Sequence, residues 1–232
     1  MGKENVNKIF QSVANKYDLM NDLMSFGLHR KWKKRFVELI DLNFKKKNII
    51  LDVGCGTGDI MFQINNKSKL NSNYLAYLVD PNMEMMKYGI KKFKKKNISW
   101  VASYGEKLPF KNNMFDLVTM SFSLRNVDNI KITLNEINRV LKKDGQFLCL
   151  EFGKIKNVAI NSIYKIYSDN FIPELGEKIT GNKEAYKYLV ESIKRFPSQE
   201  EICKILKLKK FYNIDYYNLN FGVATIFSSK KK

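Results

Sequence analysis

The chain reads Leu51-Asp52-Val53-Gly54-Cys55-Gly56-Thr57-Gly58-Asp59 at the point that decides its fold. An apolar run over 48–53 leads into this stretch, and helical spacing of apolar residues begins at Ile60. Glycine at alternate positions lets the chain turn tightly and lets a ligand approach the backbone. The first turn of the following helix offers free N–H groups to that ligand. The stretch therefore predicts a strand, a ligand-binding turn and a helix.

Three acids narrow the chemical class of the expected ligand. A dinucleotide fingerprint G-x-G-x-x-G would need glycine at 59, where Asp59 stands and would repel a pyrophosphate. An acid there is compatible with a cofactor that carries a sulfonium and an α-amino group, and Asp52 at the strand end can serve that amino group. Asp80 ends the next apolar run, 26 residues after Gly54, where an acid can accept both ribose hydroxyls. These residues predict S-adenosylmethionine as the cofactor.

Two further strand ends are expected to complete the pocket. Tyr104 and Gly105 follow the predicted third strand and could flank the adenine, and Ser121 ends the predicted fourth strand. Ligands of open α/β sheets bind beyond the carboxyl ends of the strands. We therefore expect all these positions to meet at one edge of the sheet.

Apolar runs and helical patterns alternate along the chain, as in a parallel sheet. The last two predicted strands, 214–219 and 223–227, are separated by only three residues, which indicates an antiparallel hairpin. We predict an α/β, Rossmann-like, mostly parallel seven-stranded sheet in a single domain over 1–232. Within this domain, a helical cap over 1–44 precedes the sheet, and a helical insertion over 155–206 comes before the hairpin. The other predicted strands cover 48–53, 74–79, 98–102, 115–121 and 146–152.

Composition excludes several classes of protein. With 232 residues and 44% hydrophobic content, the chain can bury a core without disulfides, and its cysteines have neither disulfide nor zinc spacing. One histidine excludes a multi-histidine metal site, and we expect no metal. No apolar run approaches the roughly 18 residues of a membrane span, and no signal peptide is evident, so we expect a cytoplasmic protein.

The formal net charge of +18 can arise in two ways, between which the sequence does not decide. Such a field favours nucleic acid or an anionic membrane surface as a partner. The excess is nearly all lysine and accompanies abundant Asn and Ile, which is typical of AT-rich coding sequence. In either case the basic runs at 30–35, 45–47 and 91–96 are predicted to be solvated faces.

Over essentially its whole length the chain resembles the UbiE-type ubiquinone/menaquinone biosynthesis C-methyltransferases. The resemblance implies a class I methyltransferase fold and cofactor contacts from Thr57, Asp80, Tyr104, Gly105 and Ser121. That family often has Asn where Tyr104 stands, so backbone contacts are the ones expected there. The segments that carry the resemblance are Phe10-Gln11-Ser12-Val13-Ala14-Asn15-Lys16-Tyr17-Asp18, 20–30, Ser121-Phe122-Ser123-Leu124-Arg125-Asn126-Val127, Leu150-Glu151-Phe152, 186–193 and 215–219.

The implied reaction is carbon methylation of a polyprenylated quinol ring, in demethylmenaquinol or in the methoxy-benzoquinol precursor of ubiquinol. Loss of a hydroxyl proton gives a phenolate, which needs electrostatic stabilisation. Arg125 is the preferred stabiliser because a guanidinium is always charged. His29 is a second catalytic candidate because histidine is the side chain whose unperturbed pKa lies near neutrality. Tyr17 could line the pocket.

A prenyl tail needs an apolar groove. The candidates for its wall are the following residues of the insertion, for which ordinary helix packing is an equal alternative: Ile163, Tyr164, Ile166, Tyr167, Phe171 and Ile172. Because such a substrate resides in membrane, the basic surface could serve peripheral docking. A homodimer or a quinone-biosynthesis complex is also compatible with the sequence, and no nucleic acid is expected.

Two other functions compete with this interpretation. The charge suggests an RNA methyltransferase, but the chain has neither a Pro-Cys motif nor an Asn-Pro-Pro-aromatic segment after the fourth strand. A non-enzymatic binding protein conflicts with the intact glycine loop and Asp80. The sequence leaves open the ring type of the quinol and the length of its tail.

Overall fold

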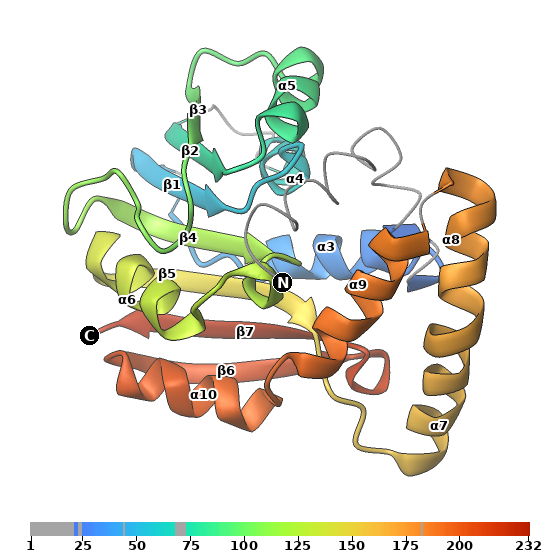
Figure 1. Cartoon of the computed structure of the whole chain (residues 1–232). Coiled ribbons are helices and arrows are strands. Elements are labelled where there is room, and N and C mark those ends of the chain that lie inside the picture. The colour runs from blue at the N-terminus through green and yellow to red at the C-terminus, as the bar shows by residue number, and fades with distance from the viewer. Residues whose placement is uncertain (1–20, 23–24, 44, 68–72, 182) are drawn as a thin grey trace.

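The computed structural model describes residues 21–22, 25–43, 45–67, 73–181 and 183–232. They build one seven-stranded sheet in the order β3-β2-β1-β4-β5-β7-β6, with helices on both faces (Figure 1). The strands are β1 (Asn48–Val53), β2 (Tyr74–Asp80), β3 (Ile98–Ala102), β4 (Phe115–Ser121), β5 (Leu141–Phe152), β6 (Phe211–Leu219) and β7 (Ala224–Lys231). The first five strands are parallel, and β7 runs antiparallel to both β5 and β6. The predicted fold class is confirmed.

Helices of the described residues follow the predicted alternation. Those that flank the parallel strands are α3 (His29–Glu38), α4 (Asp59–Lys67), α5 (Met83–Lys92), the 3-10 turn η2 (Leu124–Asn126) and α6 (Ile130–Val140). Helix α6 is capped by Asn129, whose side chain accepts a hydrogen bond from the N–H of Ile132. Before the hairpin come α7 (Val158–Ile166), the π-helical turn η3 (Tyr167–Phe171), α8 (Ile172–Thr180), α9 (Lys183–Arg195) and α10 (Gln199–Leu208). The short turn η4 (Asn220–Gly222) joins β6 to β7.

Strand β5 begins five residues earlier than predicted. Leu141 already pairs with Phe115, and after an irregularity the pairing resumes between Leu117 and Gln146. Residues 143–145, which precede the predicted strand, are therefore a bulge within it, where Asp144 has a φ of 63°. Turn residues mark a change of backbone direction, but sequence alone does not tell a bulge from a turn that starts a strand.

Each parallel strand serves two cores because successive side chains point to opposite faces of the sheet. Ile50 and Leu148 belong to the cluster under α3 and α4, whereas Leu51 and Cys149 belong to the cluster under α6 and α10. All four side chains are completely buried. This two-sided burial accounts for the continuous apolar runs that identified the strands.

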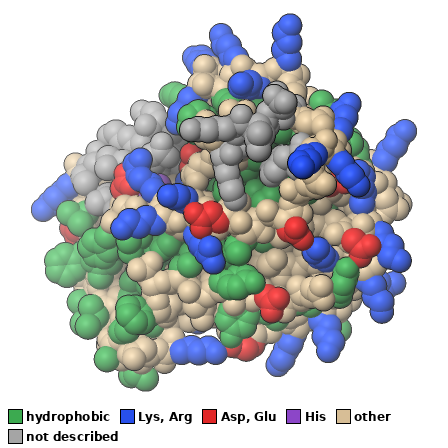
Figure 2. Space-filling model, turned by 180° about the vertical axis from the view of Figure 1, so that it is seen from behind, with side chains coloured by type: hydrophobic (Ala, Val, Ile, Leu, Met, Phe, Trp, Pro, Cys, Tyr) green, Lys and Arg blue, Asp and Glu red, His purple; other side chains and the backbone are tan. Residues whose placement is uncertain are grey.

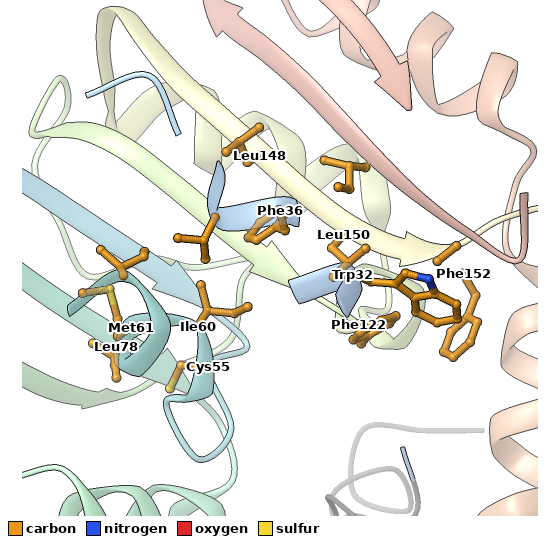
Figure 3. Close-up of a cluster of buried hydrophobic side chains, with 14 of the residues drawn as sticks. Trp32, Phe36, Cys55, Ile60, Met61, Leu78, Phe122, Leu148, Leu150 and Phe152 are labelled. Carbon is orange, nitrogen blue, oxygen red and sulfur yellow. The ribbon is translucent and has the colours of Figure 1, made fainter. Parts of the chain in front are cut away.

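Helix α3 packs its apolar side onto β5, as the close-up of the first cluster shows (Figure 3). Trp32 and Phe36 point from the helix toward Leu148, Leu150 and Phe152, and the Trp32 ring lies edge-on to Phe152 at 6.2 Å. The Trp32 Nε1 donates a hydrogen bond of 2.6 Å to Asn220 Oδ1 in η4. The helix thereby connects the N-terminal part of the chain to the C-terminal hairpin.

The prediction that the basic run 30–35 forms a solvated face is wrong at two positions. Trp32 is 2% exposed and Lys33 is 5% exposed, because both lie on the side of α3 that faces the sheet and α4. The neighbours at 30, 31, 34 and 35 are exposed, as are the lysines at 45–47 and 91–96 that were also predicted to be solvated. In the described part of the chain, no helix is long and apolar enough to cross a membrane.

Candidate active site

A cleft opens beyond the carboxyl ends of β1, β2 and β4, where the strand order reverses between β1 and β4. Open α/β sheets bind their ligands at such a switch point. The space between its walls is about 800 Å³, a volume that includes the part open to solvent. The predicted residues Gly54, Asp80, Tyr104, Gly105 and Ser121 all line it.

The glycine loop needs its glycines for conformation and for space. Gly54 has a φ of 67°, and a Cβ built on it would lie 2.4 Å from the Cβ of Ser123. Gly56 has a φ of 54°, and its N–H donates a 2.8 Å hydrogen bond to Asp80 Oδ2. A side chain at either position would strain the backbone and, at Gly54, would collide with the neighbouring loop. The loop is a cradle for a ligand that approaches the backbone.

Asp80 is fixed in the cleft by backbone hydrogen bonds. Its Oδ1 accepts the N–H of Asn82 and its Oδ2 accepts that of Gly56, each at 2.8 Å. Burial raises the pKa of this carboxyl to about 6, and the two hydrogen bonds oppose the rise. A carboxylate can accept about four hydrogen bonds, so each oxygen retains a lone pair for a ribose hydroxyl. The arrangement fits the predicted role.

The loops after β3 and β4 face each other across the cleft. The Tyr104 side chain is about one-third exposed, and a Cβ on Gly105 would touch Thr133 on α6 at 3.1 Å. The N–H of Asp128 donates a 2.8 Å hydrogen bond to Glu106 Oε1, which connects the two loops. These loops form the end of the cleft where the sequence predicts the adenine.

A smaller cavity adjoins the cleft and shares Gly54, Gly56 and Ser121 with it. Thr57 and Asp52 line this cavity, and Asp52 is 1% exposed. Thr119 donates a 2.7 Å hydrogen bond to Asp52 Oδ1, while Asp52 Oδ2 has no hydrogen-bond partner among the described residues. Burial raises the pKa of Asp52 to about 7, and the nearby acids Asp80 and Asp59 raise it further.

The two cavities fit S-adenosylmethionine. An orphaned carboxylate oxygen in the small cavity calls for a donor such as an α-ammonium group, because buried polar atoms are otherwise paired. The Ser121 hydroxyl is likewise buried without a partner among the residues described. Asp80 at the other end provides acceptors for a ribose. The sequence-predicted cofactor residues Asp52, Gly54, Thr57, Asp80, Tyr104, Gly105 and Ser121 therefore come together, although Asp52 and Thr57 line only the smaller cavity.

Arg125 forms a buried ion pair with Glu151. Its side chain is 1% exposed, and its Nη1 donates to Glu151 Oε1 at 2.7 Å and to the carbonyl oxygen of Phe122 at 2.6 Å. Glu151 also accepts the backbone N–H groups of Arg125 and Phe152, and its side chain is fully buried. The guanidinium carbon lies 5.3 Å from the centre of the Phe152 ring. Arg125 Nε has no hydrogen-bond partner in the described part of the chain.

Arg125 lies behind the cleft lining rather than in it, because the neighbouring residues Ser123, Asn126 and Val127 form the wall. Tyr188 on α9 donates a 3.2 Å hydrogen bond to Asn126 Oδ1 and so joins the insertion to η2. The Tyr164 hydroxyl on α7 is buried with no hydrogen-bond partner among the described residues. Burial raises the pKa of Tyr164 well above its ordinary value, and the charge of Arg125 opposes this rise.

His29 does not line either cavity. It is 3% exposed at the start of α3, and its Nε2 lies 2.8 Å from Asp22 Oδ1. Burial and the positive charge of Lys33 lower the pKa of His29, and the hydrogen bond with Asp22 opposes them. Tyr17, the other N-terminal candidate, lies outside the described residues.

The strand order, the glycine cradle and the acid at the end of β2 define a class I S-adenosylmethionine-dependent methyltransferase. A profile of the ubiE/COQ5 methyltransferase family matches residues 1–231. The chain therefore belongs to the ubiE/COQ5 methyltransferase family.

Individual relatives agree with this membership. The chain is 47% identical to the ubiquinone/menaquinone biosynthesis C-methyltransferases UbiE of Rickettsia bellii and Rickettsia felis, over 97% of this chain and 92% of each relative. Among solved structures it resembles an S-adenosylmethionine-dependent methyltransferase of Thermotoga maritima, a possible histamine N-methyltransferase. That likeness has a TM-score of 0.68 and 18% identity, and it covers 98% of this chain and all of the other. At that identity, the likeness concerns the fold alone.

Sequence reasoning missed two charged residues of the site. Glu151 lies in a segment that carries the family resemblance, but the sequence assigned it no role, and Lys33 was grouped with surface charges. An acid inside the apolar run 146–152 is a signal for Glu151, because a buried acid needs a partner. The signal for Lys33 is weaker: it directly follows Trp32, beside the apolar side of α3.

Replacing Asp52 by Asn is expected to stabilise the protein without cofactor, and more so at pH 8 than at pH 5. A carboxyl whose folded pKa of about 7 exceeds its ordinary value of 3.8 is protonated more readily in the folded state. Stability is therefore lost as the pH rises between these values, and Asn removes this loss while it retains an acceptor for Thr119. Melting temperatures at the two pH values measure the effect, and exposed Asp215→Asn is the control. An equal shift at both pH values would contradict the assignment.

Proposed function

We propose that the protein methylates a ring carbon of a polyprenylated quinol, either a demethylmenaquinol or a methoxy-benzoquinol. One observation supports this most directly: the segment 121–127 supplies part of the wall of the cofactor cleft and also Arg125, which pairs with the buried Glu151 of β5. The same segment distinguishes this family from other methyltransferases that share the glycine loop. An RNA methyltransferase is not favoured, since the relatives are quinone-biosynthesis enzymes over nearly the whole chain.

Arg125 is proposed to stabilise the phenolate of the quinol. A ring carbon becomes nucleophilic when an adjacent hydroxyl loses its proton, and a buried guanidinium favours the resulting charge because few waters screen it. Glu151 and the Phe122 carbonyl hold one nitrogen of Arg125 behind the cleft wall, so the guanidinium is proposed to act on the phenolate through its charge and not by direct contact. The cofactor, when bound, would supply the methyl group from its sulfonium and leave as a thioether, and the methylated ring carbon would then release its proton to restore the aromatic ring.

The cofactor residues are proposed to hold the donor in a fixed orientation. Asp80 binds the ribose, Asp52 the amino group, and Ser121, Thr57 and the 104–105 backbone complete the contacts. Fixing two reactants in line removes much of the entropic barrier to the transfer. His29 is proposed to position the start of α3 through its hydrogen bond with Asp22, since it lines neither cavity.

The six residues proposed as a wall for the prenyl tail do not form one surface. Ile172 is fully buried and Tyr164 turns its hydroxyl inward, whereas Ile163, Ile166 and Phe171 are exposed. The inner side of α7 and η3 therefore remains the candidate wall, and the outer side faces solvent. Helix α7 turns Tyr164 toward the charge of Arg125 and exposes Ile163 on its outer side. We propose that a lipid tail would lie along its inner side.

We propose that this outer surface contacts the membrane that holds the substrate. Val158 is 79% exposed and Ile163 71%, and Phe26 stacks on Tyr167 of η3 at 4.3 Å while remaining 69% exposed. Hydrophobic side chains gather over this side of the molecule, with lysines around them (Figure 2). Apolar side chains in the interface and cations near anionic headgroups both favour peripheral binding.

Methyl transfer to quinols tests the reaction. The purified protein with S-adenosylmethionine is expected to methylate the ring of at least one of two short-chain substrates, a demethylmenaquinol and a methoxy-benzoquinol. Mass spectrometry locates the added methyl on carbon, and the oxidised quinones serve as controls because they lack the ionisable hydroxyl. Turnover of neither quinol, with turnover of RNA, would overturn the proposal.

Changing the Arg125–Glu151 pair separates its chemical role from its structural role. Glu151→Gln is expected to lower the melting temperature, because an unpaired buried charge costs about 3–5 kcal/mol. Arg125→Met combined with Glu151→Gln removes both charges and is expected to recover much of that stability. Its kcat is expected to stay well below that of the unchanged protein. Calorimetry checks that cofactor affinity changes less than about threefold. If the double variant recovered turnover as well as stability, Arg125 would have no electrostatic role.

Binding to vesicles tests the membrane surface. The double variant Ile163→Asp/Ile166→Asp is expected to bind anionic phospholipid vesicles at least about tenfold more weakly, because each buried Ile contributes about 1.5–3 kcal/mol. Leu208→Asp is the matched control, since Leu208 is 76% exposed on α10, away from this surface (Figure 1). Cosedimentation measures all three proteins. Equal losses in the two variants, or no loss in the first, would contradict the assignment.

A further inference from the structure

Helix α3 carries one buried cation into the small cavity beside the cleft. The Lys33 side chain is 6% exposed, and its Nζ lies 2.6 Å from Asp59 Oδ2 at the start of α4. Both residues line the cavity together with Asp52 and Thr57. The next residue along the helix, Lys34, is exposed. The burial of Lys33 therefore reflects its position on the helix and not the general excess of lysine.

The ion pair with Asp59 leaves most of the hydrogen-bonding capacity of Lys33 unused. An ammonium group has three donors, and Asp59 is its one hydrogen-bond acceptor among the described residues. Removing such a group from water is costly unless its donors are satisfied. A ligand in the cavity that carried an anionic oxygen would supply the missing acceptor.

The same cavity holds an anionic acceptor with a free oxygen. Asp52 Oδ2 is buried and has no hydrogen-bond partner in the described part of the chain. The charge of Lys33 also acts on Asp52 and lowers its pKa, against the larger effect of burial. One wall therefore presents an ammonium group and a carboxylate oxygen, both with hydrogen-bonding capacity to spare. This pair matches the two charges of an α-amino acid zwitterion.

We propose that Lys33 Nζ binds the α-carboxylate of the cofactor while Asp52 Oδ2 accepts a hydrogen bond from its α-ammonium group. The inference rests on S-adenosylmethionine as the cofactor and extends its site to a residue of α3. Asp59 is then a positioning residue, which holds the Lys33 ammonium at the cavity and balances its charge. The acid at 59 that conflicts with a pyrophosphate thus helps to recognise a carboxylate.

Two ligands that differ in the amino acid portion test this assignment by calorimetry. S-adenosylhomocysteine carries the α-carboxylate and the α-ammonium group, and 5′-methylthioadenosine lacks both. Lys33→Met is expected to weaken binding of S-adenosylhomocysteine by about ten- to a hundredfold, the scale of a hydrogen bond between charged groups. Binding of 5′-methylthioadenosine is expected to change by less than about threefold. Lys34→Met is the matched control and is expected to leave both affinities unchanged.

A second variant covers the case in which Lys33→Met leaves Asp59 without a partner and unfolds the protein. Lys33→Met with Asp59→Asn removes both charges and is expected to show the same loss, confined to S-adenosylhomocysteine. Equal losses for the two ligands would assign Lys33 to the folding of the loop alone and overturn the proposal. Unchanged affinity for S-adenosylhomocysteine would also overturn it. Failure of the proposed quinol chemistry would leave these affinities unaffected, so the two hypotheses are tested separately.

Discussion

The carboxylate of Asp80 holds the parts of the cofactor site together. It accepts one backbone N–H from the glycine loop after β1 and one from the turn that begins α5. The N–H groups of Gly54 and Cys55 both donate to the Val79 carbonyl, so the loop is fastened to the end of β2 at several points. Because these bonds satisfy the backbone, the loop can keep its left-handed glycine conformation and present a cradle to a ligand.

Buried charge is the second organising feature of the site. Asp80 is hydrogen-bonded by the backbone alone, Asp52 retains a free oxygen, and Arg125 with Glu151 forms a fully buried pair. Each arrangement costs free energy in the folded protein, since ions are poorly solvated there. Sites that bind charged groups and stabilise developing charge keep such unfavourable arrangements, because a ligand or transition state satisfies them.

Much of the fold could be predicted from the pattern of apolar and turn residues along the sequence. The strands 48–53, 98–102 and 115–121 have the predicted bounds, and the antiparallel hairpin is where the sequence indicated. Errors arose where tertiary contacts override local signals: the bulge at Asp144 extends β5, and packing against α4 buries Lys33 in a run of exposed charges. The residues that line the two cavities could be predicted because ligands of open α/β sheets bind beyond the carboxyl ends of the parallel strands.

What the sequence by itself determined is the fold class, the cofactor loop and the family, because these depend on residue types at fixed spacing along one chain. What only the tertiary structure decided is how distant charges combine. Arg125 meets Glu151 across 26 positions, as does Lys33 with Asp59. The apolar residues of the insertion separate into buried ones, such as Ile172, and exposed ones, such as Ile163, only when the helices are packed. Local periodicity predicts which residues share a face of an element, whereas the partner of that face depends on how the elements pack in three dimensions.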